Sequence, residues 1–277
     1  MTFLRKVKLK MEKLGIIAGA GELPVLLARA AAAHERQPVI IQITKSDAQR
    51  FAGIECELHT YGVGQIQKIA RTLLNSGVKE VVIIGKVEKN ILLRPFQIDT
   101  TTIKILVQNR REKPSVIVNA ALNYLESVGL TILTQDQYLQ HLFPQPSVLT
   151  TRQPTASQWA DIKLGISIAR QIANMDIGQT VAVKNQIVLA MEAIEGTDAT
   201  IQRGGNLGKQ GIVVAKAAAE NHDFRIDVPT VGLQTLEVLH DVKASVLAVE
   251  ACRTFMIDAD VLIQQADRWK IAIVAVK

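Results

Sequence analysis

The first half of the chain alternates short apolar runs, rich in β-branched residues, with stretches of helical periodicity. The apolar runs predict strands at residues 14–18, 38–43, 80–84 and 131–134. The helical patterns lie at residues 22–33, 66–74 and 115–127. Apolar strands that alternate with helices are typical of a parallel sheet that is covered on both faces. We therefore expect an N-terminal Rossmann-like, doubly wound α/β domain.

The second half predicts another α/β domain. Apolar periodicity indicates a helix at 158–174, and the following pattern indicates a hairpin at 179–191 that turns at Asn185-Gln186. Further strands are expected at residues 211–215, 245–249 and 270–276, with helices at 234–242 and 258–269.

Residues 144–157, between these halves, contain three prolines and several hydroxyl side chains but no apolar period. Such a composition is typical of a linker. The expected domains are therefore residues 11–145, the Rossmann-like domain, and residues 156–277, the second α/β domain. Ligands usually bind in clefts of the kind found between two such domains.

The charge of the chain is concentrated at its start. The formal net charge is +6, and residues 1–10 contribute +4 of it through Arg5, Lys6, Lys8 and Lys10 without any acid. The rest of the chain carries only +2, and aromatic residues make up 4% of the sequence, so we expect no nucleic-acid partner. Two interpretations of the leader stay open: a disordered tail, or a contact with anionic lipid headgroups.

Neither a membrane span nor a secretory signal is indicated. No stretch reaches the ~20 apolar residues that cross a bilayer, and Glu22, Pro24 and Arg29 interrupt the first apolar region. Cys56 and Cys252 lack the spacing of metal ligands and are interpreted as structural thiols in a reducing cytoplasm. The sequence leaves open whether the chain forms a homo-oligomer.

The first candidate site is a glycine-rich turn after the first predicted strand, which comprises Gly19, Ala20, Gly21, Glu22 and Leu23. Glycines let a backbone approach a phosphate, and a helix N-terminus offers N–H groups and partial positive charge. However, the dinucleotide fingerprint needs glycine where Pro24 stands, and the P-loop ending is absent. Ligand contact and a plain strand-to-helix turn both stay open.

Gly85 and Lys86 follow the third predicted strand of this half. Loops at the carboxyl ends of parallel strands face the binding crevice of a doubly wound sheet. Lys86 is therefore either a phosphate-binding cation or a solvated surface lysine.

Acidic residues gather in the second half. Glu192, Glu195 and Asp198 lie close together, and such oxygen ligands suit Mg²⁺, which completes its shell with substrate phosphate and water. The alternative is that Thr197 or Asp198 caps the helix that follows.

Further along, Asp223, Arg225 and Asp227 would point to one side of an extended chain. That face would suit a metal-bound phosphate held by arginine, or it is a row of surface ion pairs. The five histidines are scattered, and neither a His-Glu-x-x-His pair nor a Gly-x-Ser-x-Gly elbow is present. The sequence therefore gives little support to nucleophilic triads.

Four strings follow one another along the chain: GIIAGAGELP, GQIQKIARTLLNSGVKEVVIIGKV, DIGQTVAVKNQIVLAMEAIEGTDATIQR and RIDVPTVG. Together they resemble the LpxI-type UDP-2,3-diacylglucosamine pyrophosphatases of lipid A biosynthesis, from about Leu14 to the C-terminus. The resemblance implies a cytoplasmic, Mg²⁺-dependent hydrolase whose partner is a UDP-linked diacylated sugar. It would release UMP and 2,3-diacylglucosamine 1-phosphate, and it could contact the inner membrane surface peripherally.

The resemblance also implies roles for residues. Its essential acid falls on Asp227, which we expect to bind Mg²⁺ and organise the hydrolytic water, with Arg225 on the phosphate. Asp198 and Glu192 are the further expected metal ligands. The expected substrate contacts are Gly19, Ala20, Gly21, Glu22, Leu23, Gly85, Lys86, Thr197, Lys216 and Thr230.

The chain departs from the family pattern after Lys216. The family typically reads Ala-Lys-x-Pro-Lys-Pro-x-Gln, whereas Ala219 and His222 stand here in place of the second lysine and the glutamine. This departure motivates an alternative, a non-catalytic nucleotide-sugar binding or regulatory protein on the same fold. A third hypothesis, a dinucleotide-dependent oxidoreductase, rests on the glycine turn alone.

Overall fold

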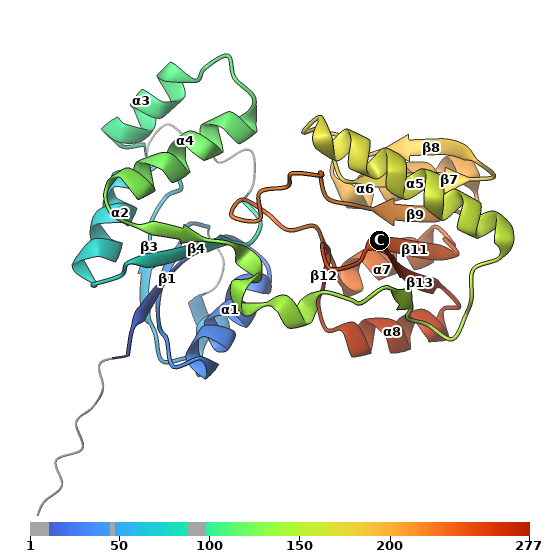
Figure 1. The fold of residues 1–277 in the computed structure, drawn as a ribbon, viewed down its shortest axis with the longest axis horizontal. Helices are drawn as coiled ribbons and strands as arrows, with labels where there is room; N and C mark the ends of the chain where they lie inside the picture. The colour runs from blue at the N-terminus through green and yellow to red at the C-terminus, as the bar shows by residue number, and fades with distance from the viewer. Residues whose placement is uncertain (1–10, 45–47, 88–97) are drawn as a thin grey trace, which may run out of the picture. The chain divides into compact units, whose positions relative to one another are not determined.

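The computed structural model describes residues 11–44, 48–87 and 98–277 (Figure 1). The basic leader, residues 1–10, lies outside the described residues. The chain divides into two compact units. The first comprises the chain up to Leu139 together with Phe224–Asp227, and the second comprises Gln140–Asp223 and Val228–Lys277.

The first unit is built on a five-stranded sheet in the order β3-β2-β1-β4-β5, in which all neighbours are parallel. Its strands are β1 (Lys13–Ala18), β2 (Gln37–Gln42), β3 (Glu57–Thr60), β4 (Glu80–Ile84) and β5 (Thr131–Leu133). The sheet winds outward in both directions from β1, as a Rossmann-like fold requires. The predicted fold class of this half is confirmed.

Helices connect these strands: α1 (Leu23–Ala33), α2 (Ile66–Asn75), α3 (Thr100–Gln108) and α4 (Pro114–Ser127), with short 3-10 helices η1 (Ala48–Phe51) and η4 (Gln135–Tyr138). The core beside α2 and α4 contains apolar side chains such as Ile41, Leu73, Val81 and Leu122, each at most 1% exposed. Continuous apolar strands are therefore explained by burial on both sides of the sheet.

The second unit contains a mixed six-stranded sheet in the order β6-β13-β11-β9-β7-β8. Its strands are β6 (Ser147–Val148), β7 (Thr180–Lys184), β8 (Ile187–Met191), β9 (Val213–Lys216), β11 (Val246–Glu250) and β13 (Ala272–Val276). β9, β11 and β13 are parallel, whereas β7 and β6 run antiparallel to their neighbours. A short parallel pair, β10 (Thr230–Val231) and β12 (Phe255–Met256), lies outside this sheet.

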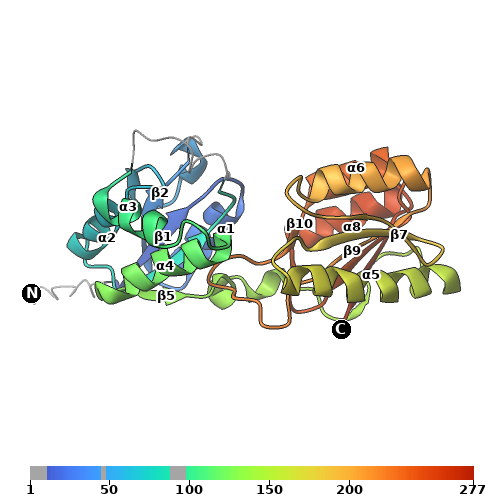
Figure 2. The same ribbon diagram turned by 90° about the horizontal axis from the view of Figure 1, so that it is seen from above.

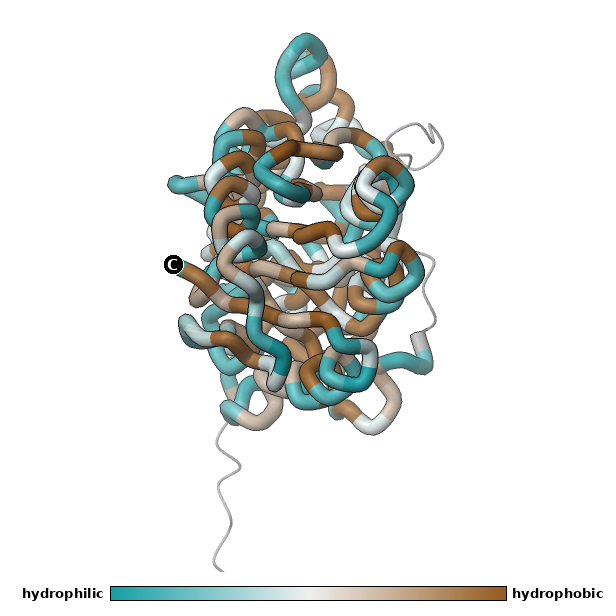
Figure 3. Tube along the Cα trace, turned by 90° about the vertical axis from the view of Figure 1, so that its right-hand side faces the viewer, coloured by the Kyte–Doolittle hydropathy of each residue, from teal (hydrophilic) through white to brown (hydrophobic). Residues whose placement is uncertain are grey.

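The sheet of the second unit is covered on both faces by α5 (Ala156–Asn174), α6 (Thr197–Gly208), α7 (Leu233–Asp241) and α8 (Ala259–Arg268). Figure 2 shows α5 on one face and α6 and α8 on the other. One apolar cluster fills each side of the sheet. Figure 3 shows that apolar positions recur along these strands and that polar positions gather in the loops.

The predicted hairpin at 179–191 is confirmed as β7 and β8. Asn185 and Gln186 both have positive φ, 52° and 62°, as a tight hairpin turn demands. The buried Asp161 carboxylate of α5 accepts hydrogen bonds from both of their backbone N–H groups, at 2.9 and 2.7 Å. This carboxylate therefore supports the turn.

The expected linker is partly wrong. Ser147–Val148, within the stretch 144–157, forms β6 and pairs with β13, so this segment belongs to the sheet of the second unit. A strand of two residues is too short to show a period in sequence. The chain passes from the first unit to the second at Leu139/Gln140, before that stretch.

Candidate functional site

The glycine turn and the Gly85-Lys86 loop, singled out separately from the sequence, are joined in the structure. Ala20 N donates to Lys86 O at 2.8 Å, and Lys86 N donates to Ala20 O at 2.9 Å. Gly19 N donates to Ile84 O at 2.8 Å. The two loops therefore form one assembly at the carboxyl ends of β1 and β4.

Close packing of the backbone explains both central glycines. A Cβ on Gly19 would lie 2.7 Å from Gly85 O, and a Cβ on Gly85, whose φ is +98°, would lie 2.8 Å from Ala20 O. The N–H groups of Gly19 and Ala20 are used within this packing. Among the described residues, the backbone N–H groups of Gly21, Glu22 and Leu23 donate no hydrogen bond. These three N–H groups are therefore available to bind an anion.

Arg50, which the sequence analysis missed, lies over the same turn. Its guanidinium donates to Gly21 O at 3.0 Å and to Gly19 O at 2.8 Å, and it stacks on the Phe51 ring at 4.7 Å. Burial lowers the pKa of Arg50, but an arginine stays charged in proteins. A lone arginine before an irregular segment carries no motif, so only the structure could place this cation beside the turn.

At the carboxyl end of β9 in the second unit, three predicted residues are joined in a hydrogen-bonded chain. Lys216, 7% exposed, donates from Nζ to Thr197 Oγ1 at 2.9 Å. Thr197 Oγ1 donates in turn to Glu192 Oε1 at 3.1 Å. The Thr180 hydroxyl lies 3.3 Å from Thr197 Oγ1. A buried cation, two hydroxyls and a carboxylate thus meet at the first turn of α6, where phosphate is favoured.

The capping interpretation of Thr197 and Asp198 is wrong. Gly196, with φ +85°, is the N-cap of α6, and no side chain caps the helix. Asp198 lies in the first turn, where a carboxylate is favoured by the helix dipole, and accepts a hydrogen bond from Gln234 Nε2 at 2.9 Å. The neighbouring Glu195 pairs with Arg203, and a backbone hydrogen bond together with Arg203 lowers the pKa of Glu195.

The segment that carries Arg225 and Asp227 is not extended, so the expectation that one face presents Asp223, Arg225 and Asp227 is wrong. Phe224–Ile226 form a turn that belongs to the first unit. Arg225 pairs there with Glu126 at 3.1 Å. Asp227 is exposed at the point where the chain returns to the second unit. Tertiary contacts of the turn outweigh the period-2 pattern of its sequence.

The three expected metal ligands do not form a group within either unit. Asp227 belongs to the first unit, and Asp198 and Glu192 belong to the second. In the part of the chain that the structure describes, no three His, Cys, Asp or Glu side chains come together to hold a metal ion. Mg²⁺ commonly takes only one or two carboxylates beside phosphate and water, and the exposed Asp227 carboxylate is a donor of that kind.

The remaining predicted residue, Thr230, begins β10 and donates from Oγ1 to Val228 O at 2.8 Å. Its backbone pairs with β12.

Two family models match almost the whole chain: the LpxI N-terminal domain over residues 13–142 and the LpxI C-terminal domain over residues 145–274. The chain belongs to the LpxI family. It is 28% identical over 270 residues to the UDP-2,3-diacylglucosamine pyrophosphatase LpxI of Caulobacter vibrioides, an alignment that covers 93% of this chain and 95% of that protein. The similarity thus extends through both units of this LpxI-family chain.

Solved structures resemble the chain only distantly. A UDP-glucose-4-epimerase from Stenotrophomonas maltophila is 16% identical, with a TM-score of 0.30 over 53% of this chain and 40% of the epimerase. The Cj0485 dehydrogenase is 17% identical, with a TM-score of 0.27 over 43% of this chain and 49% of its own. Separately, no helix among the described residues of this LpxI-family chain has the length and apolar character of a membrane span.

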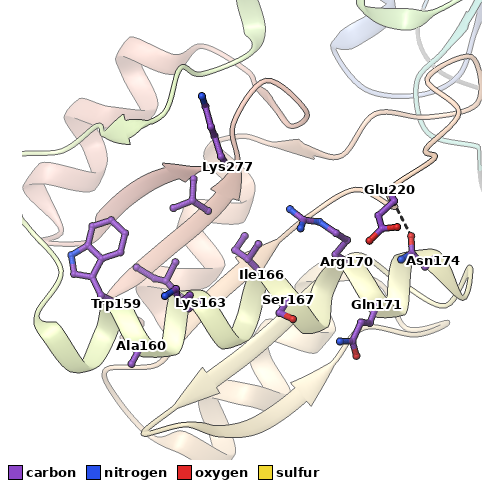
Figure 4. Close-up of a pocket in the computed structure, with 12 residues that line it drawn as sticks. Trp159, Ala160, Lys163, Ile166, Ser167, Arg170, Gln171, Asn174, Glu220 and Lys277 are labelled. Atoms are coloured by element: carbon purple, nitrogen blue, oxygen red, sulfur yellow. Dashed lines mark hydrogen bonds between the residues drawn. The ribbon is translucent and has the colours of Figure 1, made fainter.

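A groove of about 780 Å³ runs along α5 in the second unit of this LpxI-family chain (Figure 4). Trp159 lies near its one end, and Asn174 lies at the other, where it accepts a hydrogen bond from Glu220 N at 2.8 Å. Arg170, on the same helix, pairs with the buried Glu250 at 2.7 Å. None of the site residues expected from the sequence lines this groove.

Glu250, at the end of β11, fixes the loop in which this LpxI-family chain departs from the family pattern. Its Oε2 accepts a hydrogen bond from Ala218 N at 2.9 Å. Arg253, 3.4 Å from the same carboxylate, donates to the carbonyls of Ala219 and Glu220. The loop after Lys216 is therefore held by a buried carboxylate and an arginine, without a lysine at position 219.

Proposed function

We propose that this protein hydrolyses the pyrophosphate of UDP-2,3-diacylglucosamine and releases UMP and 2,3-diacylglucosamine 1-phosphate, with Mg²⁺ as cofactor. The observation that carries this proposal is the match to both LpxI domains across the chain. The activity in the name of the Caulobacter relative supports it, because the alignment leaves little of either protein uncovered.

Each unit carries polar groups at its strand ends that suit an anionic substrate. The buried Lys216 ammonium, held beside the first turn of α6 by Thr197, can neutralise phosphate charge. In the first unit, the N–H groups at residues 21–23 and the Arg50 cation can bind a second anionic group. No covalent nucleophile is needed, because positioning and charge stabilisation suffice for attack by water.

We assign the orientation of the attacking water to Asp227, whose carboxylate can accept its proton. A bound Mg²⁺ would neutralise phosphate charge and polarise water, and Asp227 would hold it, with Asp198 or Glu192 as a further ligand. Glu192 already accepts hydrogen bonds from Thr197 and from Gln179 N. Its role as a ligand would therefore replace one of these bonds. To bind phosphate, Arg225 would have to leave its ion pair with Glu126.

The test is release of UMP from UDP-2,3-diacylglucosamine by the purified full chain. We expect turnover with Mg²⁺, loss of turnover with EDTA, and a loss of at least about a thousandfold in Asp227→Ala, because the water loses its orienting group. Asp241→Ala, which removes an exposed carboxylate at the end of α7, is the matched control and should keep wild-type turnover. Normal turnover by a folded Asp227→Ala protein would contradict the assignment.

A non-catalytic nucleotide-sugar binding protein is the second candidate, and the loop at Ala219 and His222 motivates it. The carbonyl of Ala219 there accepts a hydrogen bond from Arg253. The positive charge beside position 219, where the family pattern has a lysine, therefore comes from another segment of the chain. Tight binding of the UDP-sugar without product under any divalent metal would favour this candidate over the hydrolase.

We also propose a peripheral contact of the basic leader with an anionic membrane surface. The motivation is the charge of +4 in residues 1–10 and the diacylated substrate of the proposed reaction.

A further inference from the structure

We infer that Gln135 is a positioning residue, which anchors the turn Phe224–Ile226 on the first unit and thereby fixes the place of Asp227. The consequence for catalysis rests on the proposed function. Gln135 is the first residue of η4 and is only 3% exposed. Nothing in its sequence surroundings distinguishes it from Gln137, two residues later in the same 3-10 helix.

Two hydrogen bonds join Gln135 to this turn. Its backbone N donates to Phe224 O at 2.9 Å, and its side-chain Nε2 donates to Ile226 O, also at 2.9 Å. Both bonds connect segments about 90 residues apart in the sequence. A buried amide that lost such a partner would retain the cost of its desolvation without compensation. These bonds therefore specify where the turn lies.

Packing on the first unit reinforces the same anchor. The Ile226 side chain packs against the apolar cluster beside α2 and α4, and Arg225 pairs with Glu126 of α4. On the far side of Asp227, Val228 is 6% exposed and belongs to the second unit. Asp227 is thus an exposed residue between two anchored neighbours. The backbone at Asp227 therefore has little freedom as long as Gln135 holds Ile226.

The expected kinetic effect follows from this geometry. Removal of the side-chain anchor leaves the Asp227 carboxylate in the protein but lets its position vary, and small misplacements of a reacting group are costly for rate. The substrate contacts assigned to Lys216, Thr197 and the glycine turn do not include Gln135. We therefore expect kcat to fall while KM stays nearly constant.

The variants for the test are Gln135→Leu, which removes the side-chain donor and keeps its approximate volume, and Gln137→Leu as the matched control on the exposed side of η4. The first readout does not depend on activity: trypsin cleavage of the bond after Arg225, followed by mass spectrometry of the full chain. We expect cleavage there to be about tenfold faster in Gln135→Leu and unchanged in Gln137→Leu, because one anchoring hydrogen bond is lost.

The second readout is the reaction itself. Gln135→Leu should lose about tenfold or more in kcat with KM within about twofold of wild type, and Gln137→Leu should match wild type. If Gln135→Leu fails to fold, Gln135→Met has a similar length and no side-chain donor, and the same results are expected of it.

The outcomes separate this inference from the proposed function. Wild-type cleavage after Arg225 together with wild-type kcat in Gln135→Leu would overturn the inference. A rise in KM as large as the fall in kcat would also overturn it, because Gln135 would then act on binding. If the wild-type protein released no UMP while cleavage still accelerated in Gln135→Leu, the proposed function would fail and the anchor itself would stand.

Discussion

Gly85 and Gly129 have almost the same backbone conformation, with φ of +98° and +99°, in different surroundings. A Cβ on Gly85 would lie 2.8 Å from both Ala20 O and Pro24 Cγ, whereas a Cβ on Gly129 would meet nothing within 4 Å. The conformational need for glycine is therefore shared. Of these two glycines, only Gly85 also lets two loops of the candidate site approach each other.

This pair predicts two different losses of stability. Gly129→Ala should lower the free energy of unfolding by about 1–2 kcal/mol, the cost of positive φ for a residue with Cβ. Gly85→Ala should lower the free energy of unfolding by about 1–3 kcal/mol more than Gly129→Ala, which is the typical effect of overpacking. It should also weaken binding of the UDP-sugar. Urea unfolding of both variants measures the difference. Equal losses would show that the close approach does not require Gly85.

At the residue scale, the sequence located the right turns but not the reason for their glycines. The spacing of Gly19 and Gly21 after a strand indicated a phosphate loop. The structure shows that Gly19 serves contact with Gly85, far along the chain. Contacts between distant backbone segments leave no periodic signal, and for the same reason Arg50 and Gln135 could not be found from sequence.

Among the elements, β3 is an edge strand that was not predicted from the sequence. It reads Glu-Leu-His-Thr, and its side chains are alternately half-buried and exposed, so it lacks the apolar run of its neighbours. α3 was missed as well, because Ile103 and Val107 are 48% and 61% exposed and do not form a buried stripe. The apolar strands β1, β2 and β4 could be predicted because both of their faces are buried.

The first residue of β3, Glu57, is tied to β1 by an ion pair with Lys13 and accepts a hydrogen bond from Ser76 Oγ at 2.9 Å. The hydrogen bond from Lys13 lowers the pKa of Glu57 below its ordinary value of 4.5. A carboxyl group with a depressed pKa stabilises the fold above the unfolded-state value, and this contribution is lost as the pH falls through the folded-state value. The side chain is 37% exposed, so solvent screening keeps the effect modest.

Glu57→Gln should therefore destabilise the protein at neutral pH, and the difference from wild type should shrink as the pH falls below about 4.5. Urea unfolding at neutral pH and at a pH below about 4.5 measures this difference. Glu55→Gln, which changes an exposed carboxylate nearby, should have little effect at either pH. A difference that stays constant between the two pH values would rule out the Lys13 pairing as its cause.

Across the whole molecule, the two-domain arrangement could be anticipated from the change of pattern along the chain, but the membership of Phe224–Asp227 could not. The string that carries these residues lies among segments of the second unit. In the part of the chain that the structure describes, it contacts the first unit through Gln135, Glu126 and apolar packing of Ile226. The candidate site was predicted as a set of residues, and its division between the units came from the structure.

The leader gives a prediction for the whole molecule. Deletion of residues 1–10 lowers the net charge from +6 to +2, and each basic residue near an anionic surface contributes about 1 kcal/mol to membrane binding. The fraction bound to phosphatidylglycerol vesicles at low salt should therefore fall strongly. Replacement of Arg5, Lys6, Lys8 and Lys10 by glutamine should lower it equally at unchanged length. An unchanged bound fraction in both variants would contradict the proposed membrane contact of the leader.

The passage of the chain back to the first unit at Phe224–Asp227 bears on how the protein is made. A ribosome synthesises residues up to Leu139 long before it reaches Ile226, and domains commonly fold as they emerge. The nascent first unit therefore lacks the residue that packs on its core at this place, and the Gln135 donors lack their carbonyls. Only after most of the second unit has been translated does the segment that bears Asp227 complete the first.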